Sequence, residues 1–216
     1  KKSFVEVSGR KGLGVKADDL LDQVTERAER EVAARHSDLT TEQRRQIAVI
    51  IGTAAVRYFM IKFARGKVIA FDIDEALSFE GETGPYLQYA TVRARKILKK
   101  LKESSGIGIS EMLASLTSTP TDGLTNEAGD ELWDLILEAA RLDEITDQAV
   151  RTLELSTLAK YAFGLAQRFN AFYHSSPVIM EDSEAIRRWR VAGVSYFQTQ
   201  MTRALDLMGC QVRERM

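Results

Sequence analysis

Residues 79–101 read FEGETGPYLQYATVRARKILKKL, a turn followed by a helix that carries two tyrosines among basic residues. Gly84 and Pro85 indicate the turn, and proline is also favoured in the first turn of a helix. At about 100° per residue, the apolar side chains fall on one stripe, which we predict to face the core. This stripe holds Leu87, Ala90, Ala94, Ile97, Leu98 and Leu101. The far side of the helix, which we expect to face solvent, holds Gln88, Arg95, Lys99 and Lys102.

A second stripe lies along the edge of the first. It holds Tyr86, Tyr89 and Arg93, because residues three and four apart are neighbours on a helix, and Lys96 and Lys100 extend it. Two interpretations stay open from these residues alone. Tyrosines often flank a core with their hydroxyls in water, and the cations would then form a solvated face. Alternatively, the rings stack with unpaired RNA bases while the cations hold the phosphates.

The rest of the chain has a helical period almost throughout. The first helix is predicted to begin near Asp18, and a second runs from a capping sequence at Thr40 to Gly66. Later helices are predicted over residues 131–141, 145–155, 156–174 and 183–208. Residues 104–129 are rich in Ser, Thr and Gly, so we predict an exposed connection there with a short helix over 110–116.

Strand signals are almost absent after residue 16, although Phe4, Val5 and Val7 resemble a short strand. The sequence therefore predicts an all-α helical bundle. No apolar run reaches the roughly 18–20 residues that cross a bilayer. No apolar signal core follows Lys1 and Lys2, so no secretory peptide is expected.

The net charge limits the kinds of partner that the chain can attract, and the cysteine content indicates the redox state of its compartment. The net charge is −1, so any basic surface must be local. The single cysteine, Cys210, excludes an internal disulfide, suits a reducing cytoplasm and is expected in the core. The two histidines, His36 and His174, suggest no chemistry, and no metal site is predicted.

Four stretches of the chain resemble, in order, the C-terminal part of arginyl-tRNA synthetase, a class I aminoacyl-tRNA synthetase. They read AVIIGTAAVRYFMIKF (48–63), FDIDEALSFEGETGPYLQYATVRAR (71–95), AFGLAQRFNAFY (162–173) and ALDLMGCQVRERM (204–216). Together they span nearly the whole chain, and the second is the most specific. The resemblance implies a helical anticodon-binding domain of the DALR type over residues 40–216. The end of the catalytic domain, with its signature loop and following helix, would occupy residues 1–39.

The resemblance also gives the second stripe a purpose. It implies that Tyr86, Tyr89 and Arg93 bind the anticodon region of tRNA-Arg, together with Tyr173 and the terminal Met216. From the residues alone, Tyr173 could equally cap the core, and Met216 could be a frayed terminus. Nearby Asn170 and Gln167 read as polar surface.

The first residues resemble the mobile signature loop of class I synthetases, which closes over ATP. The stretch VEVSGRKGLG (5–14) supplies Ser8, Gly9, Arg10 and Lys11, and cations on a flexible loop suit the charge of a triphosphate. In register, Glu6 and Gly9 stand where the signature has lysines. Taken alone, a short Gly-Arg-Lys-Gly run is more often a solvated loop than a phosphate site.

The resemblance implies that the parent enzyme joins L-arginine to tRNA-Arg with ATP and Mg²⁺. This chain shows neither the His-Ile-Gly-His type motif nor the strand–helix alternation of a nucleotide-binding domain. We therefore expect a C-terminal fragment, monomeric and cytoplasmic, that binds no membrane and no cofactor and is inactive alone. The alternatives are the equivalent domain of a sister enzyme such as cysteinyl-tRNA synthetase, or a helical scaffold for a protein partner.

Overall fold

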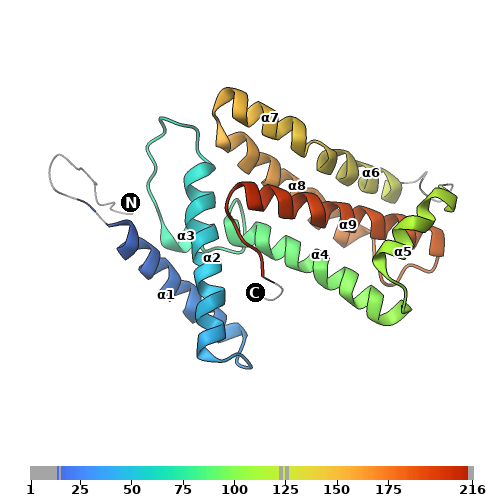
Figure 1. The fold of residues 1–216 in the computed structure, drawn as a ribbon, viewed down its shortest axis with the longest axis horizontal. Coiled ribbons are helices and arrows are strands. Elements are labelled where there is room, and N and C mark those ends of the chain that lie inside the picture. Colours follow the sequence, from blue (N-terminus) through green and yellow to red (C-terminus); the bar gives the residue numbers. More distant parts are fainter. Residues whose placement is uncertain (1–13, 15, 122–123, 125–126, 214–216) are drawn as a thin grey trace.

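The computed structural model describes residues 14, 16–121, 124 and 127–213, and within these residues every regular element is a helix. The predicted all-α bundle is therefore confirmed. At one end of the molecule, α1 (Ala17–Arg35) packs against α2 (Thr41–Ile61), as Figure 1 shows. The later helices are α3 (Ile73–Ala76), α4 (Gly84–Ser105), α5 (Ile109–Ala114), α6 (Glu127–Ala140), α7 (Leu142–Thr152), α8 (Leu155–Ser175) and α9 (Glu184–Leu207), and a 3₁₀ turn covers Ser115–Ser118.

The main bundle is formed by α4, α6, α8 and α9, with α7 packed on α8 and α5 packed on α9. Helix α2 contacts α1 on one side, and α4 and α8 on the other, so it links the terminal pair to the bundle. The domain boundary that we predict at residue 39 falls in the connection between α1 and α2.

Helix α2 begins with the predicted capping sequence. The Thr40 hydroxyl accepts a hydrogen bond of 3.2 Å from the Gln43 amide, and the Gln43 side chain accepts one of 3.0 Å from the Thr40 amide. The predicted end of this helix at Gly66 is wrong, because the helix stops at Ile61. Gly66 instead lies in the following turn with φ +82°, a conformation that glycine adopts readily.

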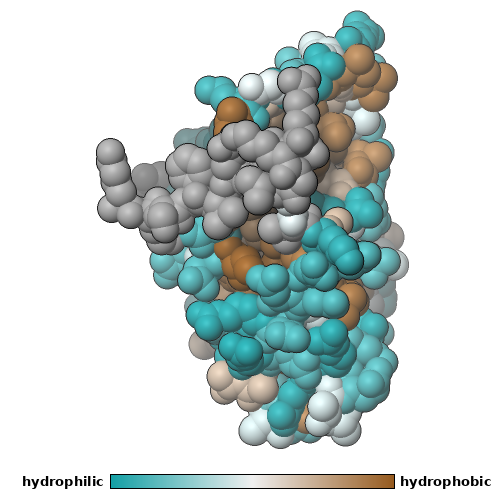
Figure 2. Space-filling model, turned by 90° about the vertical axis from the view of Figure 1, so that its left-hand side faces the viewer, coloured by the Kyte–Doolittle hydropathy of each residue, from teal (hydrophilic) through white to brown (hydrophobic). Residues whose placement is uncertain are grey.

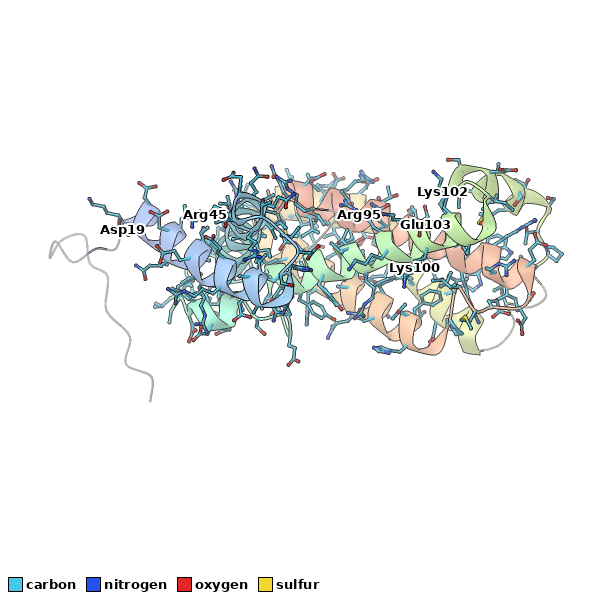
Figure 3. All side chains as sticks on the ribbon, turned by 90° about the horizontal axis from the view of Figure 1, so that it is seen from below. Asp19, Arg45, Arg95, Lys100, Lys102 and Glu103 are labelled. Atoms are coloured by element: carbon cyan, nitrogen blue, oxygen red, sulfur yellow. The ribbon has the colours of Figure 1, made fainter. Side chains whose placement is uncertain are left out.

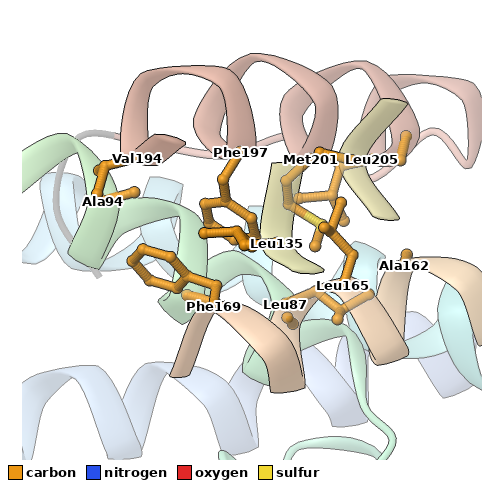
Figure 4. Close-up of a cluster of buried hydrophobic side chains, with 14 of the residues drawn as sticks. Leu87, Ala94, Leu135, Ala162, Leu165, Phe169, Val194, Phe197, Met201 and Leu205 are labelled. Atoms are coloured by element: carbon orange, nitrogen blue, oxygen red, sulfur yellow. The ribbon is translucent and has the colours of Figure 1, made fainter. Parts of the chain in front are cut away.

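Two hydrophobic clusters fill the interior. The larger one centres on Phe169 of α8 and Phe197 of α9, whose rings stack with centroids 4.0 Å apart and planes 4° from parallel (Figure 4). Cys210 also lies in this cluster, as predicted. The smaller cluster lies between α1 and α2 and includes Val24 and Phe59. Every member of the predicted core stripe of α4 is buried or half-buried.

The predicted exposed connection over residues 104–129 is wrong in part. Its helix covers Ile109–Ala114 rather than 110–116, and Met112 and Leu124 are buried in the larger cluster. The Trp189 indole of α9 donates a hydrogen bond of 3.1 Å to the Pro120 carbonyl. Scattered apolar side chains thus tie this segment to the bundle, although Ser, Thr and Gly dominate its composition.

The predicted solvent side of α4 is also wrong for Gln88, which is fully buried. After α9 the chain folds back along α4, and the Gln88 amide donates a hydrogen bond of 2.6 Å to the Gln211 carbonyl. Arg95 donates one of 3.3 Å to the Val212 carbonyl. Only Lys99 and Lys102 are exposed as expected. In Figure 3, Arg95 lies midway along α4, while Lys100 and Lys102 lie near the end far from α1.

The surface around α1 is largely polar. Figure 2 looks onto this end of the molecule, where hydrophilic residues cover most of the lower half and hydrophobic residues show in separate patches. In the part of the chain that the structure describes, no helix combines the length and the apolar character needed to cross a membrane.

Candidate nucleic-acid interface

The start of α4 holds the tyrosine stripe in a fixed place. The Thr83 hydroxyl accepts a hydrogen bond of 3.2 Å from the Tyr86 amide and donates one of 2.6 Å to the Ser78 carbonyl. Gly84 lies directly against α2: a Cβ atom at this position would stand 2.4 Å from the Ala54 carbonyl oxygen. Glycine is therefore required for this close approach of the two helices, and the approach fixes the position of the tyrosine stripe relative to α2.

Arg93 brings two helices of the candidate site together. Its guanidinium carbon lies 4.8 Å from the centre of the Tyr89 ring on α4 and 5.0 Å from the centre of the Tyr173 ring on α8, over both rings. These distances are typical of cation–π contacts. The Arg93 Nη2 atom also donates a hydrogen bond of 3.3 Å to the Tyr89 hydroxyl. Tyr89 and Tyr173 are 42% and 39% exposed, so large parts of both rings face solvent.

Asn170 of α8 connects the remaining tyrosine to this cluster. Its side-chain oxygen accepts a hydrogen bond of 2.7 Å from Arg93 Nη1, and its side-chain nitrogen donates one of 2.7 Å to the Tyr86 hydroxyl. The Tyr86 ring is half-buried against Phe163, with centroids 5.6 Å apart. Tyr86 therefore supports the cluster from the protein side, and Tyr89 and Tyr173 face outward.

A groove of about 270 Å³ runs beside the two exposed rings, between α4 and the segment that follows α8. Its lining includes Lys96 and Lys100, one and two turns beyond Arg93. Neither lysine forms an ion pair with a residue that the structure describes. Unstacked bases bind to exposed aromatic rings and phosphates bind to cations, and this surface offers both kinds of group.

The aromatic and cationic residues continue from Tyr89 toward α1. The Phe79 ring meets the Tyr89 ring edge to face, with centroids 6.3 Å apart, and the Arg35 guanidinium lies 4.7 Å from the centre of the Phe79 ring. A hollow of about 390 Å³ between α1 and residues 77–80 also has Tyr89 in its wall. Sequence reasoning missed Phe79 and Arg35, because Phe79 lies in the connection before α4 and no spacing rule relates a residue of α1 to that connection or to α4.

The structure thus brings together Tyr86, Tyr89, Arg93 and Tyr173, which the sequence resemblance assigned to one site. Their role in RNA binding stays a prediction. The structure also differs from the sequence interpretation of Arg93. The Arg93 side chain covers one face of each exposed ring instead of lying apart from the rings as a phosphate ligand. Asn170, which reads as polar surface in the sequence, joins the cluster through both ends of its amide.

Two predicted groups lie outside the described residues. They are Met216, and the signature-loop residues Ser8, Gly9, Arg10 and Lys11. Within the described ranges, no three His, Cys, Asp or Glu side chains are grouped so as to hold a metal ion.

The chain is similar to known proteins over most of its length. Residues 87–216 match the family described as the DALR anticodon binding domain. The arginine–tRNA ligase of Methanosarcina acetivorans is 37% identical over 97% of this chain and 35% of the relative, and that of Lactococcus lactis subsp. cremoris is 32% identical over 97% and 34%.

Solved structures give the same result for the fold. Thermus thermophilus arginyl-tRNA synthetase superposes with a TM-score of 0.79 at 30% identity, over 94% of this chain and 32% of that one. For the Plasmodium falciparum enzyme the TM-score is 0.75 at 23% identity, over 94% and 34%. The chain spans about a third of the length of the curated relatives it matches. It belongs to the DALR anticodon binding domain family, and the relatives that it resembles over nearly its whole length are arginine–tRNA ligases.

Proposed function

We propose that this chain binds the anticodon region of tRNA-Arg, as the C-terminal part of an arginine–tRNA ligase. The observation that carries the proposal is the cluster of Tyr89, Arg93 and Tyr173 beside a groove with two lysines that pair with no described carboxylate. RNA loops are recognised by stacking unpaired bases on aromatic rings and by neutralising phosphates. Residues 40–216 would form the anticodon-binding unit, and residues 1–39 the end of the catalytic domain.

In the whole enzyme, arginine is activated with ATP and Mg²⁺ and passed to the end of the tRNA, in the cytoplasm. Ser8, Gly9, Arg10 and Lys11 would act on the triphosphate, and Met216 would join the anticodon contacts. The chain alone binds RNA as a monomer and lacks the catalytic site. Two findings support an arginyl enzyme over a cysteinyl one: the names of the matched relatives and the GPYLQYA sequence.

The binding proposal is tested with a fluorescent anticodon stem-loop of tRNA-Arg and the 216-residue chain. Tyr89→Ala and Tyr173→Ala should each weaken binding by about 5- to 150-fold, because a stacked base contributes about 1–3 kcal/mol. Tyr196→Ala is the matched control: Tyr196 is 37% exposed, on α9 outside the groove, and its loss should leave the Kd unchanged. Circular dichroism and thermal melting check that each variant stays folded.

Unchanged binding by both folded tyrosine variants would refute the aromatic interface. Salt separates RNA binding from the protein-scaffold alternative, because phosphate contacts weaken steeply with salt and an apolar protein contact does not. A second measurement addresses catalysis. The chain should show no arginine-dependent ATP–pyrophosphate exchange, and clear exchange would show that it holds a complete catalytic site.

A further inference from the structure

We propose that Asn170 is a positioning residue, which fixes the Arg93 guanidinium between the Tyr89 and Tyr173 side chains without neutralising its charge. The inference rests on the proposed function, because it concerns how the cluster is prepared for RNA. In this arrangement Arg93 is a fixed spacer, and bases stack on the exposed ring surface that Arg93 leaves uncovered.

The hydrogen bonds define the orientation of the Asn170 amide. A guanidinium only donates hydrogen bonds, so the amide oxygen must face Arg93, and the two atoms lie 2.7 Å apart. The amide nitrogen then faces the Tyr86 hydroxyl, also at 2.7 Å. Rotating the amide by half a turn would set its N–H groups against those of Arg93. Arg93 thus sets the orientation of the Asn170 amide, since the Tyr86 hydroxyl can donate or accept, and the bond to the half-buried Tyr86 anchors the amide that holds Arg93.

Arg93 differs from Arg190 and Arg203 in the kind of partner it has. Arg190 is held by the Glu181 carboxylate at 2.6 Å, and Arg203 by the Asp143 carboxylate at 2.8 Å. Among the described residues Arg93 has no carboxylate partner; its fixed contacts are an amide, a phenol and two ring faces. A carboxylate would hold the guanidinium at least as firmly but would cancel its charge. An amide holds it and leaves the positive charge available to RNA.

Preorganisation gives this arrangement a function. A free arginine side chain loses much rotamer freedom when a ligand orders it, and that loss opposes binding. Here the side chain is already ordered before RNA arrives. The two tyrosine rings are ordered with it, because each turns one face to the guanidinium. Their exposed fractions, 42% and 39%, are the surface that remains for bases.

The test uses two variants of Asn170 that differ in charge. Asn170→Ala removes the hold on Arg93 and keeps its charge, so affinity for the anticodon stem-loop should fall about three- to tenfold with an unchanged salt dependence. Asn170→Asp keeps the hold and adds a carboxylate. It should weaken binding at least as much and reduce the slope of log K against log salt by up to about one.

A double-mutant cycle shows whether Asn170 acts through Arg93. In an Arg93→Ala background, Asn170→Ala should not change the Kd further. Equal losses from Asn170→Ala in both backgrounds, or wild-type binding and salt slope in both single variants, would overturn the positioning role. A structural readout accompanies this one: the Arg93 Nε–Hε resonance, shifted by the two rings, should move toward its free value in Asn170→Ala and stay in place in Asn170→Asp.

The failure of this proposal differs from the failure of the proposed function. If the stem-loop does not bind the wild-type chain, or if Tyr89→Ala and Tyr173→Ala bind normally, RNA recognition by the cluster is wrong and the positioning role falls with it. If the tyrosine variants lose binding and the Asn170 variants do not, the interface stands and the role of Asn170 alone is overturned.

Discussion

The Tyr58 hydroxyl on α2 donates a hydrogen bond of 3.0 Å to the Ala159 carbonyl on α8, across 101 positions of sequence. Both residues are fully buried, and burial raises the pKa of the Tyr58 hydroxyl well above its usual value, so it stays a neutral donor. Helix α2 also packs against α1, so this bond joins the terminal helix pair to the main bundle.

Removing that hydroxyl should destabilise the whole chain. Tyr58→Phe keeps the ring and loses one buried hydrogen bond, which is worth about 0.5–1.5 kcal/mol in the free energy of unfolding. Urea unfolding followed by circular dichroism measures the change. Tyr173→Phe, at a tyrosine 39% exposed, is the control and should change stability by less than about 0.5 kcal/mol. Equal stabilities of the Tyr58 variant and the wild type would show that this contact does not join the two parts.

Two helical glycines should respond to alanine with opposite signs. At Gly84 a Cβ atom would stand 2.4 Å from the Ala54 carbonyl oxygen, so Gly84→Ala must push α4 away from α2 and should cost about 1–3 kcal/mol. At Gly164, inside α8, nothing lies within 4 Å of a Cβ atom, so Gly164→Ala should stabilise by about 0.5–1 kcal/mol. Thermal melting compares the two. A loss of stability at Gly164, or none at Gly84, would contradict the packing described.

Helical periodicity in the sequence was sufficient to predict the fold class and most of the core stripe of α4. The prediction failed at Gln88, because a helical wheel shows which face of the helix a residue lies on but does not show which segment packs against that face. The covering segment includes Gln211, 123 positions away, and it is held through a backbone carbonyl that no side-chain pattern reveals.

The candidate site shows the same limit. Tyr86, Tyr89 and Arg93 share an edge of α4 by spacing alone, so their proximity could be predicted. Their partners Asn170 and Tyr173 lie on α8, and Asn170 is 77 positions beyond Arg93 in the sequence. Only the packing of α4 on α8 brings these residues close to the stripe. Resemblance to a family pointed to Tyr173, but nothing in the sequence pointed to Asn170 as the link.

The Cys210 thiol should make stability fall at alkaline pH. Burial raises its pKa from 9.0 to about 12 in the folded chain. Below about pH 9 the thiol is protonated in both states; between about 9 and 12 it ionises only when unfolded, so stability is lost by up to about 1.4 kcal/mol per pH unit. Cys210→Ala lacks this loss, while the buried tyrosines contribute equally to both proteins.

The measurement is the free energy of unfolding in urea at pH 8, 9, 10 and 11 for wild type and Cys210→Ala. The alanine variant should start less stable, because it leaves a cavity, and the gap between the two curves should narrow as the pH rises. Parallel curves would show that the thiol ionises as readily in the folded chain as in the unfolded one.

The lysines along α4 should set how strongly RNA binding depends on salt. Lys96 and Lys100 line the groove beside Tyr173, and their charges are not paired with a described carboxylate. Lys99 and Lys102 are equally charged and exposed on the same helix, but they are not part of the groove. The four residues thus form two matched pairs that differ in position alone.

The double variant Lys96→Ala/Lys100→Ala should reduce the slope of log K against log salt by about 1.4–1.8 for an anticodon stem-loop, because each lost phosphate contact contributes about 0.7–0.9. Lys99→Ala/Lys102→Ala carries the same change in net charge and should leave the slope close to that of the wild type. Fluorescence anisotropy across a potassium chloride series gives both slopes. If the slope of log K against log salt falls equally in the two double variants, RNA responds to the charge of α4 as a whole. The RNA backbone then does not lie along the groove.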